Sequence, residues 1–328
     1  MKYLITGSAG FIGFHLAKEL LKNKKNKIYG LDNLDNYYST KLKKKRISIL
    51  KKESNFKFIK LDLSNIKEIK KLYRIDVDIL FHLAAQAGVR YTLINPSKYI
   101  KSNIVGYYNL LNYIKKSKVK YIFYASSSSI YGDNKDYPVD EKMEAKPKNI
   151  YAFSKVSNEN CSKLFSNIFS KKFIGLRFFT VYGEWGRPDM LIYKYLNFAR
   201  KKKIFYVNNF GNDYRDFTYV GDVISMLKLL VKKRKKLKDH DIFNICSNKP
   251  VKTKKIIQFL LKAFPGKVRY VGENKIEMLK THGNNKKILA FTKFKRISNF
   301  EEKFFACLNW FKNNKNLFNL INFFKTFK

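Results

Sequence analysis

The sequence predicts an α/β protein with a doubly wound parallel sheet and a smaller lobe that is interleaved toward the C-terminus. Short apolar segments alternate with segments of helical apolar spacing through the first half of the chain. A glycine turn joins the first apolar segment to the first helical one, and the alternation is lost after Phe179. This pattern indicates strands joined by crossover helices, and 328 residues suffice for such a sheet and a second lobe.

The elements of the main sheet follow from apolar periodicity. Phe11, Leu16 and Leu20 repeat at helical spacing, whereas the preceding KYLIT is a short apolar run. Strands are expected at residues 2–6, 27–31, 56–61, 79–83, 120–125 and 172–177. Helices are expected at residues 11–21, 42–52, 97–117 and 150–169.

The second half of the chain returns once to the main sheet. Residues 219–232 have a helical pattern and residues 241–245 have a strand pattern. We therefore expect one domain at residues 1–179 together with 217–250, and a lobe at residues 180–216 and 251–328. The tail from Asn313 onward is either an amphipathic helix or frayed.

The chain is strongly basic, with a formal charge of +43, which ordinarily favours nucleic-acid binding. Only ten of its 68 basic residues are Arg, and the lysines are spread among Asn, Ile, Phe and Tyr, which A/T-rich codons encode. Compositional drift explains this pattern better than a nucleic-acid patch, so no specific nucleic-acid partner is expected. The runs 43–46, 201–203 and 232–236 are interpreted as solvated helix faces, and the excess charge should attract a phosphorylated substrate.

A soluble cytoplasmic protein is expected, with no membrane partner. The longest apolar runs, such as residues 79–85, are far too short to span a bilayer. Glycines interrupt the apolar N-terminus where a signal peptide would need an unbroken core. Cys161, Cys246 and Cys307 have no CxxC or CxxH spacing, so neither a metal site nor a disulfide framework is predicted.

The motif TGSAGFIG places Gly7, Gly10 and Gly13 between the first strand and the first helix. Gly7 permits a tight turn, Gly10 lets the backbone approach a pyrophosphate, and Gly13 lets the helix pack closely. The helix N-terminus, which begins with Phe11 and Ile12, then faces the phosphates. The motif predicts a Rossmann-type dinucleotide site.

The second strand ends at Asp32, followed by Asn33. A carboxylate at this position can accept both ribose hydroxyls of NAD and would repel the 2′-phosphate of NADP. NAD is therefore the predicted cofactor, with Asp32 and Asn33 among its contacts.

Tyr151 and Lys155 form a YxxxK pattern on one face of the helix at residues 150–169. Removal of hydride from a sugar carbon requires a base for the hydroxyl proton, and nearby cations can lower the pKa of a tyrosine enough to supply it. Lys155 and the positive nicotinamide ring would do so. Alone, the pattern is more often surface sequence in a chain so rich in Tyr and Lys.

The glycine spacing GxxGxxG, the YxxxK pair and the serine run YASSSSIYG about 24 residues before it resemble the extended short-chain dehydrogenase/reductase family. The resemblance covers nearly the whole chain. It implies that Ser127 hydrogen-bonds the reacting oxygen, where the alternative is an ordinary serine-rich strand end. It also implies cofactor contacts at Asp62, Leu63, Leu83, Ala84 and Ala85. His82, in the same HLAAQ segment, is either beside the cofactor or a core histidine.

The fold hosts several reactions, so the serine run is needed to choose among them. Sugar dehydratases and nucleotide-glucuronate decarboxylases of this family carry an acid just after the catalytic hydroxyl, where this chain has Ser128 and Ser129. Without that acid, reversible oxidation at C4 remains. The expected reaction is C4 epimerisation of a UDP-sugar through a transient 4-keto intermediate, with NAD tightly bound.

Three segments are similar to UDP-glucuronate 4-epimerases: GLRFFTVYGEWGRPDM, DNLDNYY and NNFGNDYRDFTYV. This resemblance implies that Ser128 and Thr180 hold the sugar carboxylate, although Thr180 could equally cap a turn. Arg187 and Arg215 would bind the pyrophosphate, and Arg269 either does so or is a surface residue. The chain departs from the family at Glu184, usually Pro, and at the GNNKK of residues 283–287, usually an acidic ADTSK-like stretch.

Two rival hypotheses remain. A UDP-glucose/galactose or UDP-N-acetylhexosamine 4-epimerase would share everything but the carboxylate contacts, and a dehydratase is disfavoured by the missing acid. A nucleic-acid-binding protein on a retired dehydrogenase fold would have no chemical reason to keep Ser127, Tyr151 and Lys155. Family relatives dimerise through two helices that match residues 97–117 and 150–169, so a homodimer is expected.

Overall fold

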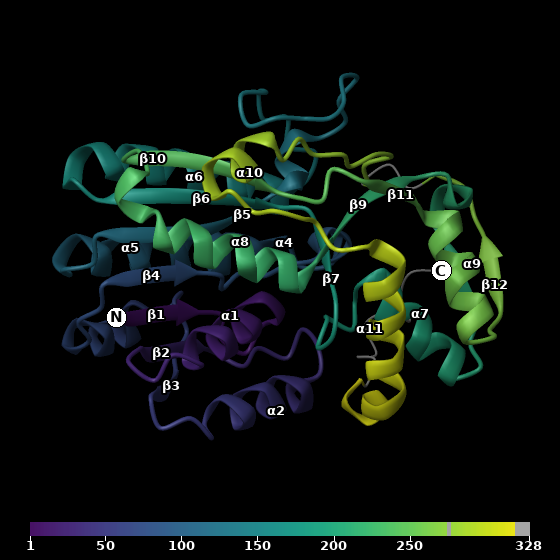
Figure 1. The fold of residues 1–328 in the computed structure, drawn as a ribbon, viewed down its shortest axis with the longest axis horizontal. Helices are drawn as coiled ribbons and strands as arrows, with labels where there is room; N and C mark the ends of the chain where they lie inside the picture. The colour runs from purple at the N-terminus through teal and green to yellow at the C-terminus, as the bar shows by residue number, and fades with distance from the viewer. Residues whose placement is uncertain (274–276, 319–328) are drawn as a thin grey trace.

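The computed structural model describes residues 1–273 and 277–318, and in this part of the chain the main sheet has seven strands in the order β10-β6-β5-β4-β1-β2-β3. All neighbouring strands are parallel, as predicted (Figure 1). The strands are β1 (Lys2–Thr6), β2 (Lys27–Asp32), β3 (Phe56–Lys60), β4 (Ile79–His82), β5 (Tyr121–Ser127), β6 (Lys172–Phe178) and β10 (His240–Ile245). The last of these confirms that the chain returns to the sheet.

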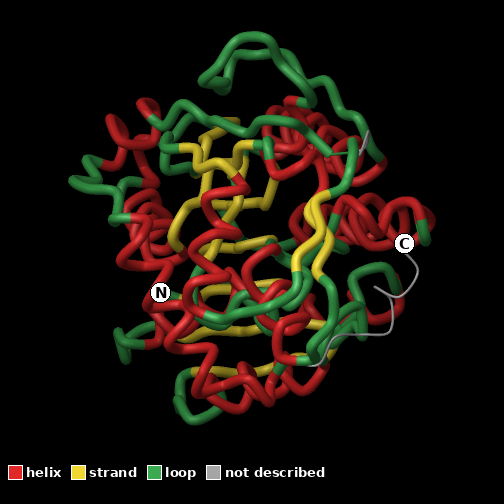
Figure 2. Tube along the Cα trace, turned by 90° about the vertical axis from the view of Figure 1, so that its right-hand side faces the viewer, coloured by secondary structure: helices red, strands yellow, loops and turns green. Residues whose placement is uncertain are grey.

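Helices cover both faces of the sheet (Figure 2). One face carries α1 (Phe11–Leu21), α2 (Thr40–Leu50), α8 (Val220–Lys232) and α10 (Lys286–Thr292). The other carries α3 (Ile66–Ile69), α5 (Gly106–Lys116) and α6 (Ile150–Phe169). Alternate side chains of β1 therefore enter different cores: Ile5 packs with α1 and α8, and Leu4 packs with α5.

The order of the strands reverses at β1. From β1 the chain proceeds outward through β2 and β3, then crosses back to β4 and continues through β5 and β6. In open α/β sheets such a reversal leaves a crevice outside the carboxyl ends of the central strands. Gly7, which follows β1, and Leu83, which follows β4, both lie there.

The helix predicted at residues 97–117 is not regular. The structure divides it into α4 (Pro96–Tyr99), a wider π-helical turn η3 (Ile100–Val105) and α5. Within that turn the buried Asn103 side chain bonds both backbone groups of Gln86, accepting from its N–H at 2.7 Å and donating to its carbonyl at 3.0 Å. The turn thus brings Asn103 to the loop after β4, a long-range contact that local periodicity does not report.

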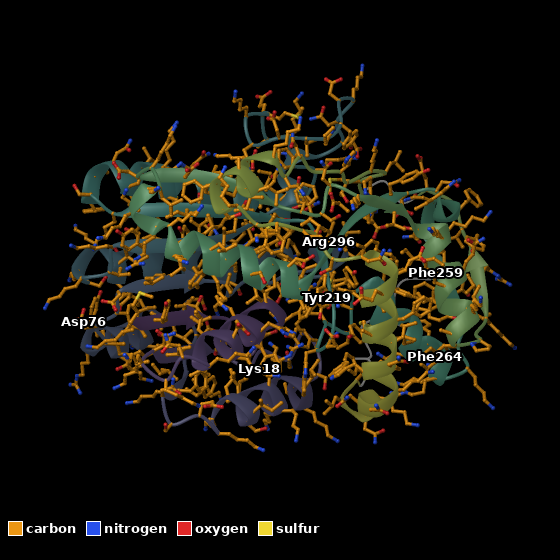
Figure 3. The ribbon with its side chains drawn as sticks, in the orientation of Figure 1. Lys18, Asp76, Tyr219, Phe259, Phe264 and Arg296 are labelled. Atoms are coloured by element: carbon orange, nitrogen blue, oxygen red, sulfur yellow. The ribbon has the colours of Figure 1, made fainter. Side chains whose placement is uncertain are left out.

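The C-terminal lobe is built from very short strands and three helices. The strands are β7 (Thr180–Tyr182), β8 (Phe205–Val207), β9 (Tyr214–Tyr219), β11 (Pro250–Lys252) and β12 (Val268–Tyr270). The helices are α7 (Leu191–Arg200), α9 (Thr253–Ala263) and α11 (Phe300–Asn314). Aromatic side chains fill its core: Phe259 and Phe264 contact Phe304 and Phe311 of α11 (Figure 3).

The domain limits at residues 179, 217 and 250 stay a prediction. Of the tail, α11 ends at Asn314 and a short turn follows at Lys315–Leu317, whereas residues 319–328 lie outside the described residues. Among the described helices none is both long enough and apolar enough to cross a bilayer.

Candidate active site

A pocket at the carboxyl edge of the main sheet, here called the cofactor pocket, joins the glycine loop to the catalytic pair. Its lining includes Tyr151 and Lys155 at one end and Asp32 at the other. Ser127 also lines it. The remaining cofactor contacts expected from the sequence that line it are Gly7, Gly10, Phe11, Ile12, Gly13, Asn33, Asp62, Leu63, Leu83, Ala84 and Ala85.

The glycine loop is shaped by close backbone contacts. Gly7 has a φ of +74°, and a Cβ there would lie 2.7 Å from the backbone nitrogen of Ala84. A Cβ on Gly13 would lie 2.2 Å from the carbonyl oxygen of Gly7. Larger residues are therefore excluded at both positions, and the open N-terminus of α1 faces the pocket, as a pyrophosphate site requires.

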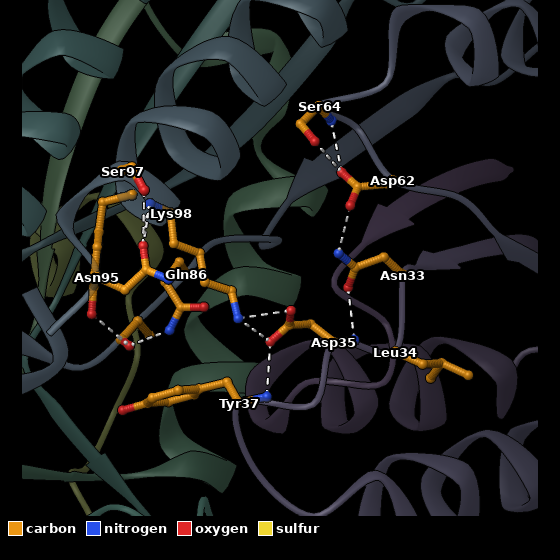
Figure 4. Close-up of polar contacts among 12 residues, drawn as sticks. Asn33, Leu34, Asp35, Tyr37, Asp62, Ser64, Gln86, Asn95, Ser97 and Lys98 are labelled. Carbon is orange, nitrogen blue, oxygen red and sulfur yellow. Dashed lines mark hydrogen bonds and ion pairs between the residues drawn. The ribbon is translucent and has the colours of Figure 1, made fainter. Parts of the chain in front are cut away.

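Two carboxylates, those of Asp32 and Asp62, line the other end of the pocket, and Figure 4 shows the contacts of Asp62 with Asn33 and Ser64. Asp32 accepts hydrogen bonds from the backbone N–H groups of Ala9, at 3.1 Å, and Leu34, at 2.8 Å. Asp62 accepts from the Asn33 amide at 3.1 Å and from Ser64. Burial opposes ionisation of Asp62, but these hydrogen bonds prevail and lower its pKa. The lining fits a dinucleotide with free ribose hydroxyls.

The catalytic pair lies at the start of α6. The side chain of Asn149 caps this helix by accepting from the N–H of Ala152, and Tyr151 and Lys155 follow one turn apart. The Lys155 ammonium donates to the carbonyl of Ala125 at 2.8 Å and lies 5.9 Å from the centre of the Tyr151 ring. β5 extends two residues beyond the predicted end, which brings Ser127 to the same place.

The electrostatics of this pair differ from the expectation in two respects, since the pKa of Tyr151 is raised rather than lowered and the cation that opposes the rise is Arg187 rather than Lys155. Burial raises the pKa of Tyr151, while a hydrogen bond from Ser127 and the charge of Arg187 oppose that rise. Burial lowers the pKa of Lys155 to about 8, and the nearby Glu159 carboxylate works against this. The charge of Arg187 thus acts on Tyr151, whereas the sequence predicts only that Arg187 binds the pyrophosphate.

A second pocket adjoins the first and is walled by the C-terminal lobe. Thr180 and Arg215, both expected to bind substrate, line it. Its charged groups occur as pairs: Arg215 lies 3.2 Å from Asp213, and Arg90 pairs with Glu277. Burial lowers the pKa of Lys194, which also lines this pocket, to about 7, and the charge of Arg90 contributes.

The other predicted substrate residues lie elsewhere. Arg187 lines the cofactor pocket, where its guanidinium is held by Asp189 through contacts of 3.0 and 2.5 Å. Ser128 is buried but lines neither pocket. Arg269 is exposed on β12 and lines neither pocket, so its role stays a prediction.

His82 belongs to the core. It is fully buried, its Nδ1 is 2.9 Å from the hydroxyl of Thr6, and its ring stacks on Tyr107. Burial, together with the charge of Lys155, lowers the pKa of His82 to about 3. Of the two interpretations of His82, the structure favours the packed core histidine.

Several pocket residues were missed by the sequence reasoning. They are Tyr37, Lys43, Arg90, Lys194 and Glu277. Arg90 could have been predicted from the sequence, because it is one of few arginines and closely follows the HLAAQ segment. The prediction that residues 43–46 form a solvated helix face is wrong for Lys43 and Arg46. Both are buried, because this face of α2 packs toward the site rather than toward solvent.

Both departures from the family pattern have structural roles. The carboxylate of Glu184 accepts from the hydroxyl of Tyr219 at 3.1 Å. In the GNNKK stretch, the N–H of Gly283 donates to Asp216, and Asn285 donates to the carbonyl of Cys246. No residue of that stretch lines either pocket.

A model of the NAD dependent epimerase/dehydratase family matches residues 3–246. An uncharacterised protein of Methanocaldococcus jannaschii is 42% identical over 323 residues, which cover 96% of this chain and 98% of that protein. A UDP-glucuronate 4-epimerase of Thermodesulfobacterium geofontis is 34% identical over 321 residues, which cover 95% of this chain and 96% of that enzyme.

Solved structures agree with these matches. The UDP-glucuronic acid 4-epimerase of Bacillus cereus, in complex with UDP-glucuronic acid and NAD, has a TM-score of 0.89 at 28% identity, covering 96% of this chain and 100% of that one. A dTDP-glucose 4,6-dehydratase of Streptomyces venezuelae also has a TM-score of 0.89, and the match covers 97% of this chain and 99% of that one. Because the two sequences are 19% identical, this similarity shows the fold alone. From its sequence, fold and pocket, the chain belongs to the NAD-dependent epimerase/dehydratase family.

Proposed function

We propose that this protein is a UDP-glucuronate 4-epimerase, which interconverts UDP-glucuronate and UDP-galacturonate with tightly bound NAD. The observation that carries the proposal is the meeting of Ser127, Tyr151 and Lys155 with the glycine loop in one pocket. The choice of sugar is supported by the full-length similarity to an enzyme of that name and to a structure that holds UDP-glucuronic acid.

The chemistry follows from the groups at the end of β5 and the start of α6. Tyr151 takes the proton from the C4 hydroxyl, and Ser127 hydrogen-bonds the same oxygen. Bound NAD supplies the reversible oxidation at C4. Lys155 and Arg187 stabilise the tyrosinate. The 4-keto sugar then turns about its phosphate linkage, and Tyr151 returns the proton after reduction on the opposite face.

The second pocket is proposed to hold the nucleotide. Arg215 would contact the diphosphate, because a guanidinium suits bidentate contact with phosphate oxygens, and Arg269 remains a candidate from the resemblance alone. Thr180, which lines this pocket, would hold the sugar carboxylate through its neutral hydroxyl, and Ser128, which lines neither pocket, remains a candidate from the resemblance alone. Arg187, beside Tyr151, would contact the sugar end of the substrate. The proposed substrate-binding lobe is residues 180–216 and 251–328, although α10 within this range packs on the main sheet.

A product assay tests the proposal directly. Purified protein is incubated separately with UDP-glucuronate, UDP-glucose and UDP-N-acetylglucosamine, without added cofactor, and products are resolved by chromatography and NMR. We expect UDP-galacturonate from the first sugar alone. Turnover of only a neutral sugar would retain the C4 chemistry and overturn the carboxylate assignment. RNA binding at physiological salt together with no turnover would favour the nucleic-acid hypothesis.

We further propose a cytoplasmic homodimer. Large apolar side chains are exposed along η3, α5 and α6: Ile100, Val105, Tyr108, Phe153, Leu164 and Ile168. Large apolar side chains exposed on helices that contact one another are typical of interfaces. Replacing Leu164 and Ile168 with Glu should convert the protein to a monomer in light scattering, and a monomeric starting protein would overturn the proposal.

A further inference from the structure

Arg46 is a buried cation between the two halves of the active site. It lies on α2, next to exposed lysines, yet none of its surface is accessible, and it is the largest of the fully buried side chains. Its hydrogen bonds go to carbonyl and hydroxyl oxygens rather than to a carboxylate, and its Nε has no partner among the described residues. Such a burial is costly, so the guanidinium must be held there for a reason other than ion pairing.

The guanidinium divides its contacts between two loops. One terminal nitrogen donates to the carbonyl of Ala9 at 2.8 Å and to the Tyr38 hydroxyl at 2.9 Å. The other donates to the carbonyls of Trp185 and, at 3.3 Å, Gly186. Ala9 lies in the glycine loop, whereas Gly186 directly precedes Arg187. The planar guanidinium of Arg46 therefore connects the glycine loop to the turn before Arg187, two segments that are far apart in the sequence.

The bridged turn depends on α1 for its shape. Trp185 has a left-handed φ of +60°, and its ring packs 5.2 Å from that of Phe14. The carbonyl of Glu184 lies 2.9 Å from Nε2 of His15. Both partners belong to the helix that carries the phosphate-facing N-terminus, so the turn before Arg187 packs directly on the helix that the glycine loop begins.

We propose that Arg46 is a positioning residue that couples NAD binding to sugar-nucleotide binding. By fixing the Trp185–Arg187 turn to the glycine loop, it lets an occupied cofactor site hold Arg187 where the substrate needs it. The inference rests on the proposed function only in assuming that a UDP-sugar binds beside the cofactor. Coupling of two sites is reciprocal, so substrate binding must also retain the cofactor.

The test measures exchange of bound NAD for isotope-labelled NAD in the holoenzyme, with and without UDP. In the unaltered protein we expect UDP to slow the exchange about 5-fold or more, the usual scale of coupling between sites. In Arg46→Met the ratio should fall to about 1, although UDP still binds by calorimetry. Arg46→Lys keeps the charge but cannot fork between two loops, so its ratio should also fall.

Ile47→Ala is the matched control, because Ile47 is buried on the same helix and its apolar side chain forms no hydrogen bond with either loop. It should lower thermal stability while keeping the full ratio. The proposal is overturned if UDP leaves exchange unchanged in the unaltered protein, if Arg46→Met or Arg46→Lys keeps the full ratio, or if Ile47→Ala loses it. Failure to epimerise UDP-glucuronate with an intact UDP effect would instead reject the proposed function alone.

Discussion

The two pockets achieve their shape by different physical means. The phosphate end of the cofactor pocket is formed by backbone: a glycine loop whose Gly7 and Gly13 tolerate no side chain, and a helix N-terminus. The second pocket is lined by three basic and three acidic side chains, which are Arg90, Lys194, Arg215, Asp189, Asp213 and Glu277. The first presents backbone N–H groups at its phosphate end, whereas the second presents side-chain ion pairs that an anionic ligand would compete with.

This difference separates retention of the cofactor from affinity for the substrate. Backbone N–H groups at the start of α1 can bind a phosphate without breaking a side-chain ion pair. A guanidinium such as that of Arg215 must give up part of its contact with Asp213 when a diphosphate arrives. Substitutions in the two pockets should therefore change different observables.

The largest effect is expected at the end of the cofactor pocket that holds Tyr151 and Lys155, where activity and NAD retention can be separated. Tyr151→Phe removes the proton-transferring oxygen and should lower kcat about 10²- to 10⁴-fold. Bound NAD per chain should stay unchanged, since the backbone cradle is intact. Steady-state kinetics and absorbance of released NAD measure the two quantities.

Tyr113→Phe is the control for Tyr151→Phe. Tyr113 is also a buried tyrosine, and its hydroxyl donates to the carbonyl of Ile75 at 2.9 Å, away from both pockets. Its loss should cost only a hydrogen bond. Retention of more than a tenth of the activity in Tyr151→Phe would remove the tyrosine from its catalytic role.

The same division explains what the sequence could predict. The glycine loop, Asp32 and the Tyr151–Lys155 pair depend on spacing within a strand, a turn or a helix, and all of them line one pocket. The parallel sheet follows from apolar periodicity, which reports burial of each segment directly. These features needed no knowledge of distant contacts.

The rest depended on contacts between distant segments. Glu277 pairs with Arg90 although the two residues are separated by more than half of the sequence. The strands β7 and β12 have three residues each, which is too short for a periodic apolar pattern. The sequence predicts that Arg46 is solvated, because the lysines next to it are. Only the fold shows that α2 turns Arg46 inward, toward a loop 139 positions further along the chain.

A smaller effect is expected in the second pocket. Arg215→Met removes a guanidinium that is half-buried and paired with Asp213, and should cost about 2 kcal/mol or more of substrate affinity, which raises KM about 30-fold. NAD content should be unaffected. Arg269→Met should change KM less than about 3-fold if its exposed position holds in the complex. A KM in Arg215→Met close to that of the unaltered enzyme would remove Arg215 from the diphosphate site.

Acid should destabilise the main domain through His82, which is buried, and His15, which is half-buried. Burial lowers the pKa of His15 to about 4, and burial with the charge of Lys155 lowers that of His82 to about 3, from an ordinary 6.5. The unfolded chain therefore binds more protons than the folded one as pH falls below 6.5. Each histidine should reduce the free energy of unfolding by about 1.4 kcal/mol per pH unit between pH 6 and 4.5.

Chemical denaturation across that pH window measures the slope. His82→Gln should lower the slope by about one proton's worth, whatever it does to stability at pH 7. An unchanged slope in His82→Gln would mean that this ring is already protonated in the folded protein.

The smallest effect concerns the boundary between the two pockets, at Thr180. The 4-keto form of a glucuronate is a β-keto acid, which loses carbon dioxide when the breaking bond overlaps with the carbonyl. A neutral hydroxyl at Thr180 can hold the carboxylate in a plane where that overlap is poor. Thr180→Val keeps the shape and removes the hydroxyl, so UDP-pentose should rise several-fold relative to the epimer, a change of about 1 kcal/mol in partition.

The partition is measured by NMR of the products and by release of carbon dioxide. Thr218→Val is the matched control, because Thr218 is a buried threonine on β9, the strand paired with β7, and lines neither pocket. It should leave the partition unchanged. A rise in pentose restricted to Thr180→Val assigns the restraint to that hydroxyl. An equal partition in the two variants would instead place the carboxylate in the cofactor pocket, near Arg187, and move the boundary between the pockets accordingly.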